Sequence, residues 1–193
     1  MLGPMLPPLL EDLKERLQGL ARAPWEGAGT APVATALAAL SLVALVEATS
    51  REGWVPVLDS LNLIFHEAGH PLFGLFGWET LTILGGTLMQ VLVPLLVAGA
   101  AWSRRQAAGT ALAVAWAFQN LHNIARYMAD AREQVLPLVG GGEHDWFNIF
   151  ARWGCLQRDT AIAAATHTVG WLGMAGSAAW LAWRWLRRTE DED

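Results

Sequence analysis

Residues 80–103, TLTILGGTLMQVLVPLLVAGAAWS, decide the fold, because they hold no charged side chain over 24 positions. A helix needs about 20 apolar residues to cross the hydrocarbon core of a bilayer. Three other uncharged windows reach that length, namely 27–46, 106–125 and 160–183. The first of these shows almost no polar face, whereas a helix of a water-soluble bundle would carry one. The sequence therefore predicts an all-α, polytopic integral membrane bundle.

A fifth window, residues 60–78, is interrupted only by Glu67. We expect it to span the bilayer or to re-enter it, which gives about five membrane helices. Tryptophans stand near the window ends, where an interfacial aromatic belt would place them. Five crossings would leave the two termini on opposite sides of the membrane. Basic residues divide almost evenly between the two sides, so they predict no orientation.

The polar parts of the chain lie outside these windows. Residues 1–24 combine leucines and charges in the pattern of an amphipathic helix on the membrane surface. Residues 25–189 form the expected membrane helical domain, within which 130–159 are a polar segment. Residues 190–193 are an acidic tail. The lipid bilayer is the first expected partner.

Charge and cysteine content exclude several classes of function. A net charge of -5 excludes a nucleic-acid-binding footprint. The single cysteine, Cys155, can form neither an intramolecular disulfide nor a thiolate zinc site. Glycine pairs lack the lysine and hydroxyl of a phosphate-binding loop, and the sequence has no G-x-S-x-G motif. Any metal must therefore be held by nitrogen and oxygen atoms.

One motif carries recognisable chemistry: His66-Glu67-Ala68-Gly69-His70 has the pattern H-E-x-x-H. Residues four apart share a face of a helix, so both imidazoles can reach one metal ion. Glu67 is placed to accept a proton from water at that metal. The motif therefore predicts a Zn²⁺ site with His66 and His70 as ligands and Glu67 as the catalytic base. The non-functional alternative is a polar cluster that packs two helices together.

The motif and its apolar flanks, LIFHEAGHPLFG over residues 63–74, resemble the metal-binding helix of the site-2 protease type of membrane metalloprotease. The resemblance covers roughly residues 61–77 and implies proteolysis in the membrane, with both histidines on zinc and Glu67 as base. The chain departs from that family at two points. Pro71 removes a backbone donor to the Glu67 carbonyl, so we expect the helix to bend there. The family's third ligand, an aspartate followed by glycine, is absent.

A second resemblance spans most of the chain. The order of the H-E-A-G-H motif, GGTLMQ at 85–90, ADAR at 129–132 and HDW at 144–146 is similar to that of a family of small, poorly characterised bacterial membrane proteins. It implies a place in the bacterial inner (cytoplasmic) membrane and no particular activity.

The sequence leaves two candidates for a third metal ligand. His144 lies in a glycine-rich loop, with Asp145 beside it, and this loop could fold back over the motif helix. Asp130 follows Asn123 and Tyr127 at helical spacing, and the three form a polar stripe on the fourth helix. Its carboxylate could bind the metal or accept a hydrogen bond from a ligand imidazole.

Three further polar residues fall inside the uncharged windows. Gln90 is expected either to point into the site or to form a hydrogen bond between packed helices. His122 and His167 are expected to be hydrogen-bonded packing residues. Because they occupy separate helices, they also allow a haem-binding electron carrier as a third hypothesis.

The favoured function is that of a membrane-embedded zinc-dependent hydrolase, a metalloprotease acting on a membrane-protein substrate. The alternative is a non-catalytic, zinc-binding membrane subunit of a larger complex. A structural zinc site is closed by four protein ligands, whereas a hydrolase leaves one position open. The coordination sphere therefore discriminates between the two functions.

Overall fold

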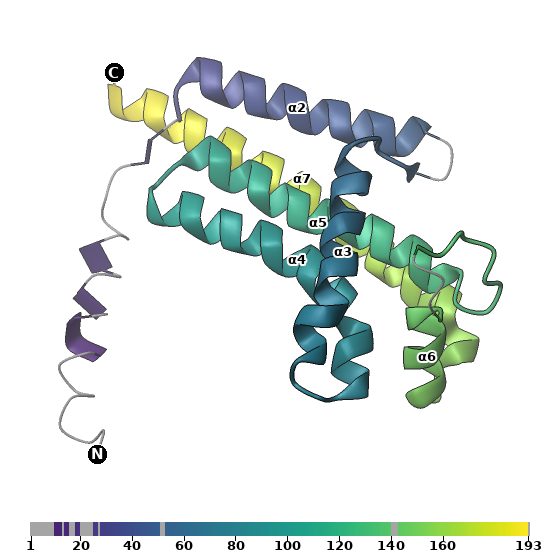
Figure 1. Ribbon diagram of the computed structural model, residues 1–193. Helices are drawn as coiled ribbons and strands as arrows, with labels where there is room; N and C mark the ends of the chain where they lie inside the picture. The colour runs from purple at the N-terminus through teal and green to yellow at the C-terminus, as the bar shows by residue number, and fades with distance from the viewer. Residues whose placement is uncertain are drawn as a thin grey trace.

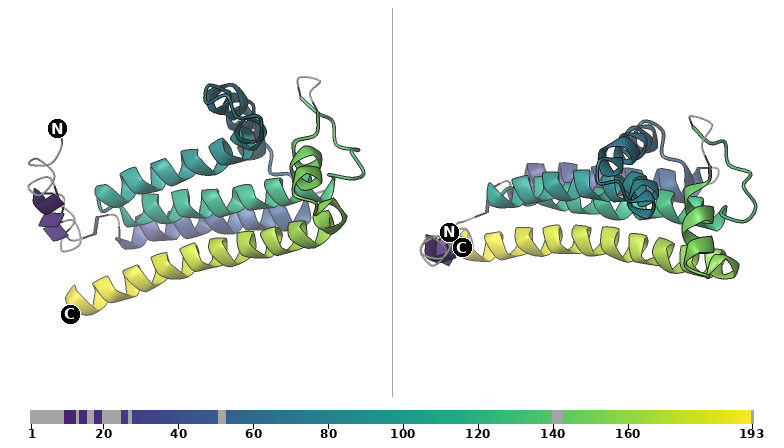
Figure 2. Two further views of the ribbon diagram at one scale, coloured as in Figure 1. Left: turned by 90° about the horizontal axis from the view of Figure 1, so that it is seen from below. Right: turned by 60° about the horizontal axis from the view of Figure 1, so that its bottom comes forward.

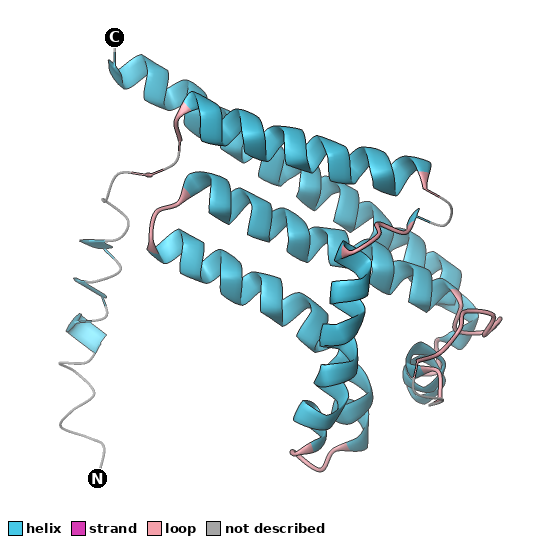
Figure 3. Cartoon of the chain, turned by 45° about the horizontal axis from the view of Figure 1, so that its top comes forward, coloured by secondary structure: helices cyan, strands magenta, loops and turns pink. Residues whose placement is uncertain are grey.

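The computed structural model describes residues 10–12, 14, 15, 18, 19, 25, 26, 28–50, 53–139 and 143–192, with 188–192 described by their backbone only. The helices are α2 (Thr30–Thr49), α3 (Leu58–Gly74), α4 (Glu79–Ser103), α5 (Ala107–Ala129), α6 (Asp145–Arg152), the short 3-10 helix η2 (Leu156–Arg158) and α7 (Asp159–Glu192). Figure 3 shows that the described elements are helices joined by loops. The all-α prediction is confirmed, and the four uncharged windows and the window 60–78 each coincide with one helix.

The long helices α2, α5 and α7 lie side by side, and most of α4 joins them (Figure 1). α4 and α7 run opposite to α2 and α5. The beginning of α2 and the last turns of α7 lie at the same end of the bundle, because the Trp185 indole donates a hydrogen bond of 3.2 Å to the Thr30 hydroxyl. The opposite end carries the loops around α6.

Helix α3 differs from the others because it lies across the bundle, and it pairs with the first part of α4 in a hairpin (Figures 1 and 2). Pro71 lies in the last turn of α3, so the missing N–H falls near the end of the helix and does not break a long one. Because α3 lies crosswise, the start of α2 and the end of α7 lie at the same end of the bundle. The expectation of termini on opposite sides does not fit this arrangement.

Two of the described helices, α2 and α4, are long and apolar enough to cross a membrane. Only 22% and 28% of their most apolar stretches are buried within the chain. Large side chains such as Leu42 on α2 and Leu96 on α4 are 62% and 63% exposed. In water, these exposed side chains would not gain the stabilisation that burial of apolar surface provides. The described chain therefore leaves large apolar surfaces of α2 and α4 uncovered.

Polar side chains lock α3 onto the bundle. The Gln119 amide of α5 donates to Glu47 Oε2 of α2 at 3.1 Å and to Asp59 Oδ1 of α3 at 2.8 Å. Asn62 Nδ2 donates to Gln119 Oε1 at 3.0 Å. Asp59 also accepts the N–H of Val55 at 2.7 Å, which fixes the entry into α3. All four polar side chains are buried, so the network sets the crossing of α3 over α5.

The predicted boundaries at the two ends of the chain are tested only in part. Much of the proposed surface helix, residues 1–24, lies outside the described residues; within it, 10–12, 14, 15, 18 and 19 are helical. At the other end, the backbone of α7 continues to Glu192. The residues of the acidic tail up to this point are therefore an extension of the last helix. The polar segment 130–159 contains α6 and η2.

Candidate metal centre

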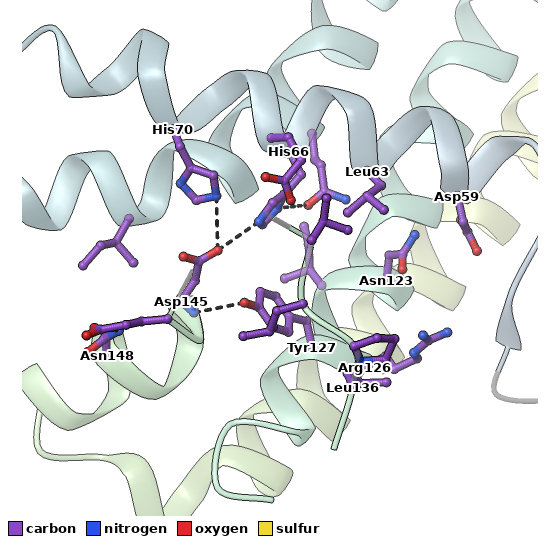
Figure 4. Close-up of a pocket in the computed structure, with 18 of the residues that line it drawn as sticks. Asp59, Leu63, His66, His70, Asn123, Arg126, Tyr127, Leu136, Asp145 and Asn148 are labelled. Carbon is purple, nitrogen blue, oxygen red and sulfur yellow. Dashed lines mark hydrogen bonds and ion pairs between the residues drawn. The ribbon is translucent and has the colours of Figure 1, made fainter. Parts of the chain in front are cut away.

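Three side chains from two distant parts of the chain converge at the crossing of α3, α4 and α6 (Figure 4). His66 and His70 belong to α3, and Asp145 is the first residue of α6. The Oδ2 atom of Asp145 lies 2.9 Å from His66 Nε2 and 3.4 Å from His70 Nε2. All three ligand atoms lie within 4.8 Å of one another. Two imidazoles and one carboxylate are a donor set that suits zinc.

The rear nitrogen of each imidazole is bound to an acceptor. His66 Nδ1 lies 2.8 Å from Gln90 Oε1, and His70 Nδ1 lies 3.0 Å from the carbonyl oxygen of Thr82. Because oxygen atoms of this kind only accept, each Nδ1 is the donor in these contacts, and each Nε2 faces Asp145. Gln90 Nε2 in turn donates to Asn120 Oδ1 at 3.4 Å, which orients its amide. Of the two uses expected for Gln90, the structure shows both: the side chain lines the cavity and forms hydrogen bonds between packed helices.

Glycines allow α3 and α4 to approach closely at this point. A Cβ atom added to Gly69 would lie 2.1 Å from the carbonyl oxygen of Gly85, so the two backbones are in direct contact. A Cβ added to Gly86 would lie 2.6 Å from the His66 imidazole. Any larger residue at these positions would push the motif helix away from α4.

Helix α6 places Asp145 opposite the two histidines. Three apolar side chains of this short helix, Trp146, Ile149 and Phe150, are at most 5% exposed and pack against α5. Burial of each such side chain stabilises the docked helix by roughly 1.5–3 kcal/mol. The backbone N–H of Asp145 donates to the Tyr127 hydroxyl at 3.0 Å, which fixes the first turn.

The Asp145 carboxylate is ionised in this environment. Burial opposes its ionisation, but hydrogen bonds from the Nε2 atoms of His66 and His70 outweigh the burial and hold the pKa of Asp145 below its ordinary value. A metal ion would replace these Nε2 protons on binding. A carboxylate with depressed pKa between two imidazoles provides the negative charge that a divalent cation needs.

His144 and Asp130, the two residues predicted as alternatives for the third ligand, lie outside this group of three. His144 caps α6, because its Nδ1 accepts the N–H of Phe147 at 3.2 Å. Its Nε2 lies 3.3 Å from Asp130 Oδ2. Burial lowers the pKa of His144 despite the nearby Asp130 carboxylate, so the neutral ring is available as a cap. The two residues therefore support the N-terminus of α6 and, through it, Asp145.

Sequence reasoning considered Asp145 only as the neighbour of His144. The signal that could have identified it is the spacing of Trp146, Ile149 and Phe150, which predicts a short helix with one apolar face. Asp145 stands four residues before Ile149 and therefore shares that inward face.

The three side chains line a cavity of about 610 Å³, together with Glu67 and Tyr127. No described side chain forms a hydrogen bond with the Glu67 carboxylate, so it is available to groups that enter the cavity. Apolar side chains form much of the remaining wall, namely Leu63, Ile83, Ile124, Leu136, Pro137, Leu138 and Val139. The cavity therefore brings together three side chains that could hold a metal ion, the Glu67 carboxylate and an apolar wall.

His122 and His167 pack against each other away from this cavity. Their ring centroids lie 4.7 Å apart, and Trp171 packs on His122 at the same distance. His122 Nδ1 also lies 3.3 Å from Glu47 Oε1. Rings in direct contact leave no room for a haem iron between them.

Comparisons of the chain with protein families, with curated proteins and with solved structures find no significant match to any of them.

Proposed function

We propose that this chain is a zinc-dependent hydrolase embedded in a membrane, and that it cleaves peptide bonds. The observation that carries the proposal is the convergence of His66, His70 and Asp145 beside Glu67 in one cavity. Catalytic zinc sites have three protein ligands and one open position, and the described residues supply three. A structural site would require a fourth protein ligand, so this observation favours hydrolysis over a non-catalytic zinc-binding subunit.

The residues present fit a zinc ion. Each histidine directs its Nε2 toward Asp145, because its Nδ1 binds an oxygen acceptor, and loss of the Nε2 proton would give the lone pair that zinc needs. Asp145 presents an ionised carboxylate oxygen. If these atoms held Zn²⁺, the ion would act as a Lewis acid: it would polarise a carbonyl group and make a bound water molecule more acidic.

Glu67 performs the proton transfers in this proposal. It follows His66 directly on α3 and lines the same cavity, so its carboxylate accepts a proton from the attacking water. The protonated carboxyl group then donates this proton to the nitrogen of the leaving amine. Tyr127 and the apolar walls hold the substrate and limit the access of other water molecules.

The proposed location is a membrane crossed by α2, α4, α5 and α7, with α3 lying across one side of the bundle. The low burial of α2 and α4 supports this location. The cavity lies between α3, α4, α5 and α6, and a membrane-protein segment is the proposed substrate. The resemblance to bacterial membrane proteins favours the bacterial inner membrane.

The test combines metal analysis with hydrolysis in water labelled with ¹⁸O. The protein is reconstituted in nanodiscs with a library of transmembrane peptides in H₂¹⁸O, and new carboxyl termini are identified by mass spectrometry. The wild type should hold one zinc ion and place ¹⁸O in the new carboxylates. Glu67→Gln should keep its zinc and lose at least about 10²-fold in rate, because the amide cannot accept the proton. Glu133→Gln, an exposed site remote from the cavity, is the matched control.

Two results would contradict the proposal. If Glu67→Gln retains both zinc and the full rate of ¹⁸O incorporation, Glu67 is not the base. If the wild type binds zinc through a fourth protein ligand and cleaves nothing, the non-catalytic subunit is the better description.

A further inference from the structure

Tyr127 occupies a fixed position beside the candidate metal ligands. Its ring lies 5.8 Å from the His66 ring on one side and 4.2 Å from the His144 ring on the other, measured between centroids. Its hydroxyl oxygen accepts the backbone N–H of Asp145 at 3.0 Å. The phenol is therefore held by three contacts, and its hydroxyl lies next to the residue that supplies the third ligand (Figure 4).

The hydrogen-bonding capacity of this hydroxyl is only partly used. A phenolic oxygen has lone pairs that accept and one hydrogen that it donates. The Asp145 N–H uses the accepting side. No described residue accepts the hydroxyl hydrogen, and the side chain lines the cavity that contains Glu67. An unperturbed phenol keeps its proton up to about pH 10, so a donor is available to a group in the cavity at neutral pH.

The surroundings determine which group that donor can serve. Carboxylates of Glu67, Asp130 and Asp145 surround the phenol and act on it electrostatically. Glu67 stands on α3 and Tyr127 on α5, on two walls of the same cavity. A scissile peptide group placed at the metal would then have the base on one wall and the phenol on the other. The carbonyl oxygen gains negative charge as water attacks, and a positioned donor stabilises that charge.

We infer that Tyr127 is a catalytic residue that donates its phenolic hydrogen to the carbonyl oxygen of the scissile bond as this oxygen becomes negatively charged. The inference rests on the proposed hydrolase function and assigns the substrate-binding side of the cavity to α5. The backbone N–H of Asp145 keeps the phenolic oxygen in place, so the donor is oriented before substrate binds.

The test uses two peptide ligands with the same leucine side chains, which suit the apolar walls. One is a phosphinic peptide, whose tetrahedral phosphorus carries a charged oxygen in place of the attacked carbonyl. The other is a thiol peptide, which binds metal through sulfur and has no such oxygen. Binding to the Co²⁺-loaded protein in nanodiscs is measured from the visible absorption of Co²⁺, for the wild type and for Tyr127→Phe.

Tyr127→Phe should weaken binding of the phosphinic peptide about tenfold to a hundredfold, which is the effect of losing a hydrogen bond to a charged oxygen. Its affinities for the thiol peptide and for Co²⁺ should fall by a smaller factor, because the variant also loses the neutral hydrogen bond from the Asp145 N–H. Equal phosphinic affinity in both proteins would show that the phenol does not contact this oxygen. Equal weakening of both peptides together with Co²⁺ would make Tyr127 only a support for Asp145. Both results overturn the inference and leave the hydrolase proposal standing. If neither peptide binds the Co²⁺-loaded wild type, the hydrolase proposal itself fails, and the inference with it.

Discussion

Gly86 on α4 lies against the imidazole of His66 so closely that a Cβ atom there would stand 2.6 Å from Nε2, the nitrogen that faces the metal position. Real Cβ atoms do not approach other atoms to this distance. Gln90, one turn further along α4, also contacts His66, with its Oε1 at 2.8 Å from Nδ1. The ring therefore has a single place to lie, and this place depends on the absence of a side chain at position 86.

Gly86→Ala should weaken metal binding by about 10–100-fold, the range found when the groups that orient metal ligands are lost. The added methyl group displaces the His66 ring away from α4 and so away from its hydrogen bond with Gln90. Gly99→Ala on the same helix is the matched control, since nothing lies within 4 Å of a Cβ there. Zinc affinity measured by competition with a chelator compares the two variants. Equal affinities would show that α4 shifts to accommodate the methyl group and that Gly86 does not determine the position of His66.

The ligand set gives a second prediction. Asp145→Ala should lose stoichiometric zinc as fully as His66→Ala or His70→Ala, because each removes one of three donors. His144→Ala should retain zinc with an affinity reduced by about 10–100-fold, since it removes only the cap of α6. Zinc content after dialysis separates complete from partial loss. The opposite ranking, with His144→Ala empty and Asp145→Ala loaded, would return the third ligand to His144.

The parts of this site that the sequence predicts are those set within one helix. His66, Glu67 and His70 follow from the periodicity of α3, which holds wherever the helix packs. The five predicted windows likewise form helices, because the backbone hydrogen bonds of a helix lie within its own segment and do not depend on other helices. Gln90 was expected at the site or between helices, and it serves both purposes by contacting His66.

The position of Asp145 could not be predicted in the same way, because it depends on contacts between distant segments. Docking of α6 requires the buried faces of Trp146 and Phe150 and the hydroxyl of Tyr127. The crosswise course of α3 has a similar origin. An uncharged window does not show whether its helix spans or crosses a bundle, and the deciding contacts of Asp59 are made with Gln119 of another helix.

The buried network that holds α3 gives a third prediction. The Gln119 amide is 1% exposed and gives one hydrogen to Glu47 and the other to Asp59. Gln119→Leu removes one donor from each of the two buried carboxylates, and the loss of a hydrogen bond to a charged group costs about 1.5–3 kcal/mol. We expect a marked fall in thermal stability, measured by the unfolding of the detergent-solubilised protein.

Gln157→Leu is the control for this variant, because Gln157 is exposed in η2. It should leave the unfolding temperature within the error of the measurement. Equal stability of both variants would mean that water or a shifted side chain replaces the Gln119 amide without loss.

The last prediction concerns acid. Asp159, the first residue of α7, is fully buried; its Oδ2 accepts Arg132 Nε at 2.8 Å and its Oδ1 accepts the N–H of Thr160 at 2.6 Å. The hydrogen bond from Arg132 is the main cause that holds the pKa of Asp159 below its ordinary value, against the effect of burial. A carboxyl group with a depressed pKa in the folded state stabilises the fold above its unfolded pKa, near 3.9.

This stabilisation is lost as the pH falls below about 4 and through the lower, folded-state pKa, where Asp159 becomes protonated. Asp159→Asn should therefore lower the unfolding temperature at neutral pH and lose less stability than the wild type on acidification. Glu133→Gln, in the same polar segment but exposed, should follow the wild-type curve. Unfolding followed between pH 7 and about pH 3 makes the comparison. Parallel curves for the wild type and Asp159→Asn would show that the contact with Arg132 adds nothing to stability, because the exposed side of Arg132 is then fully screened by solvent.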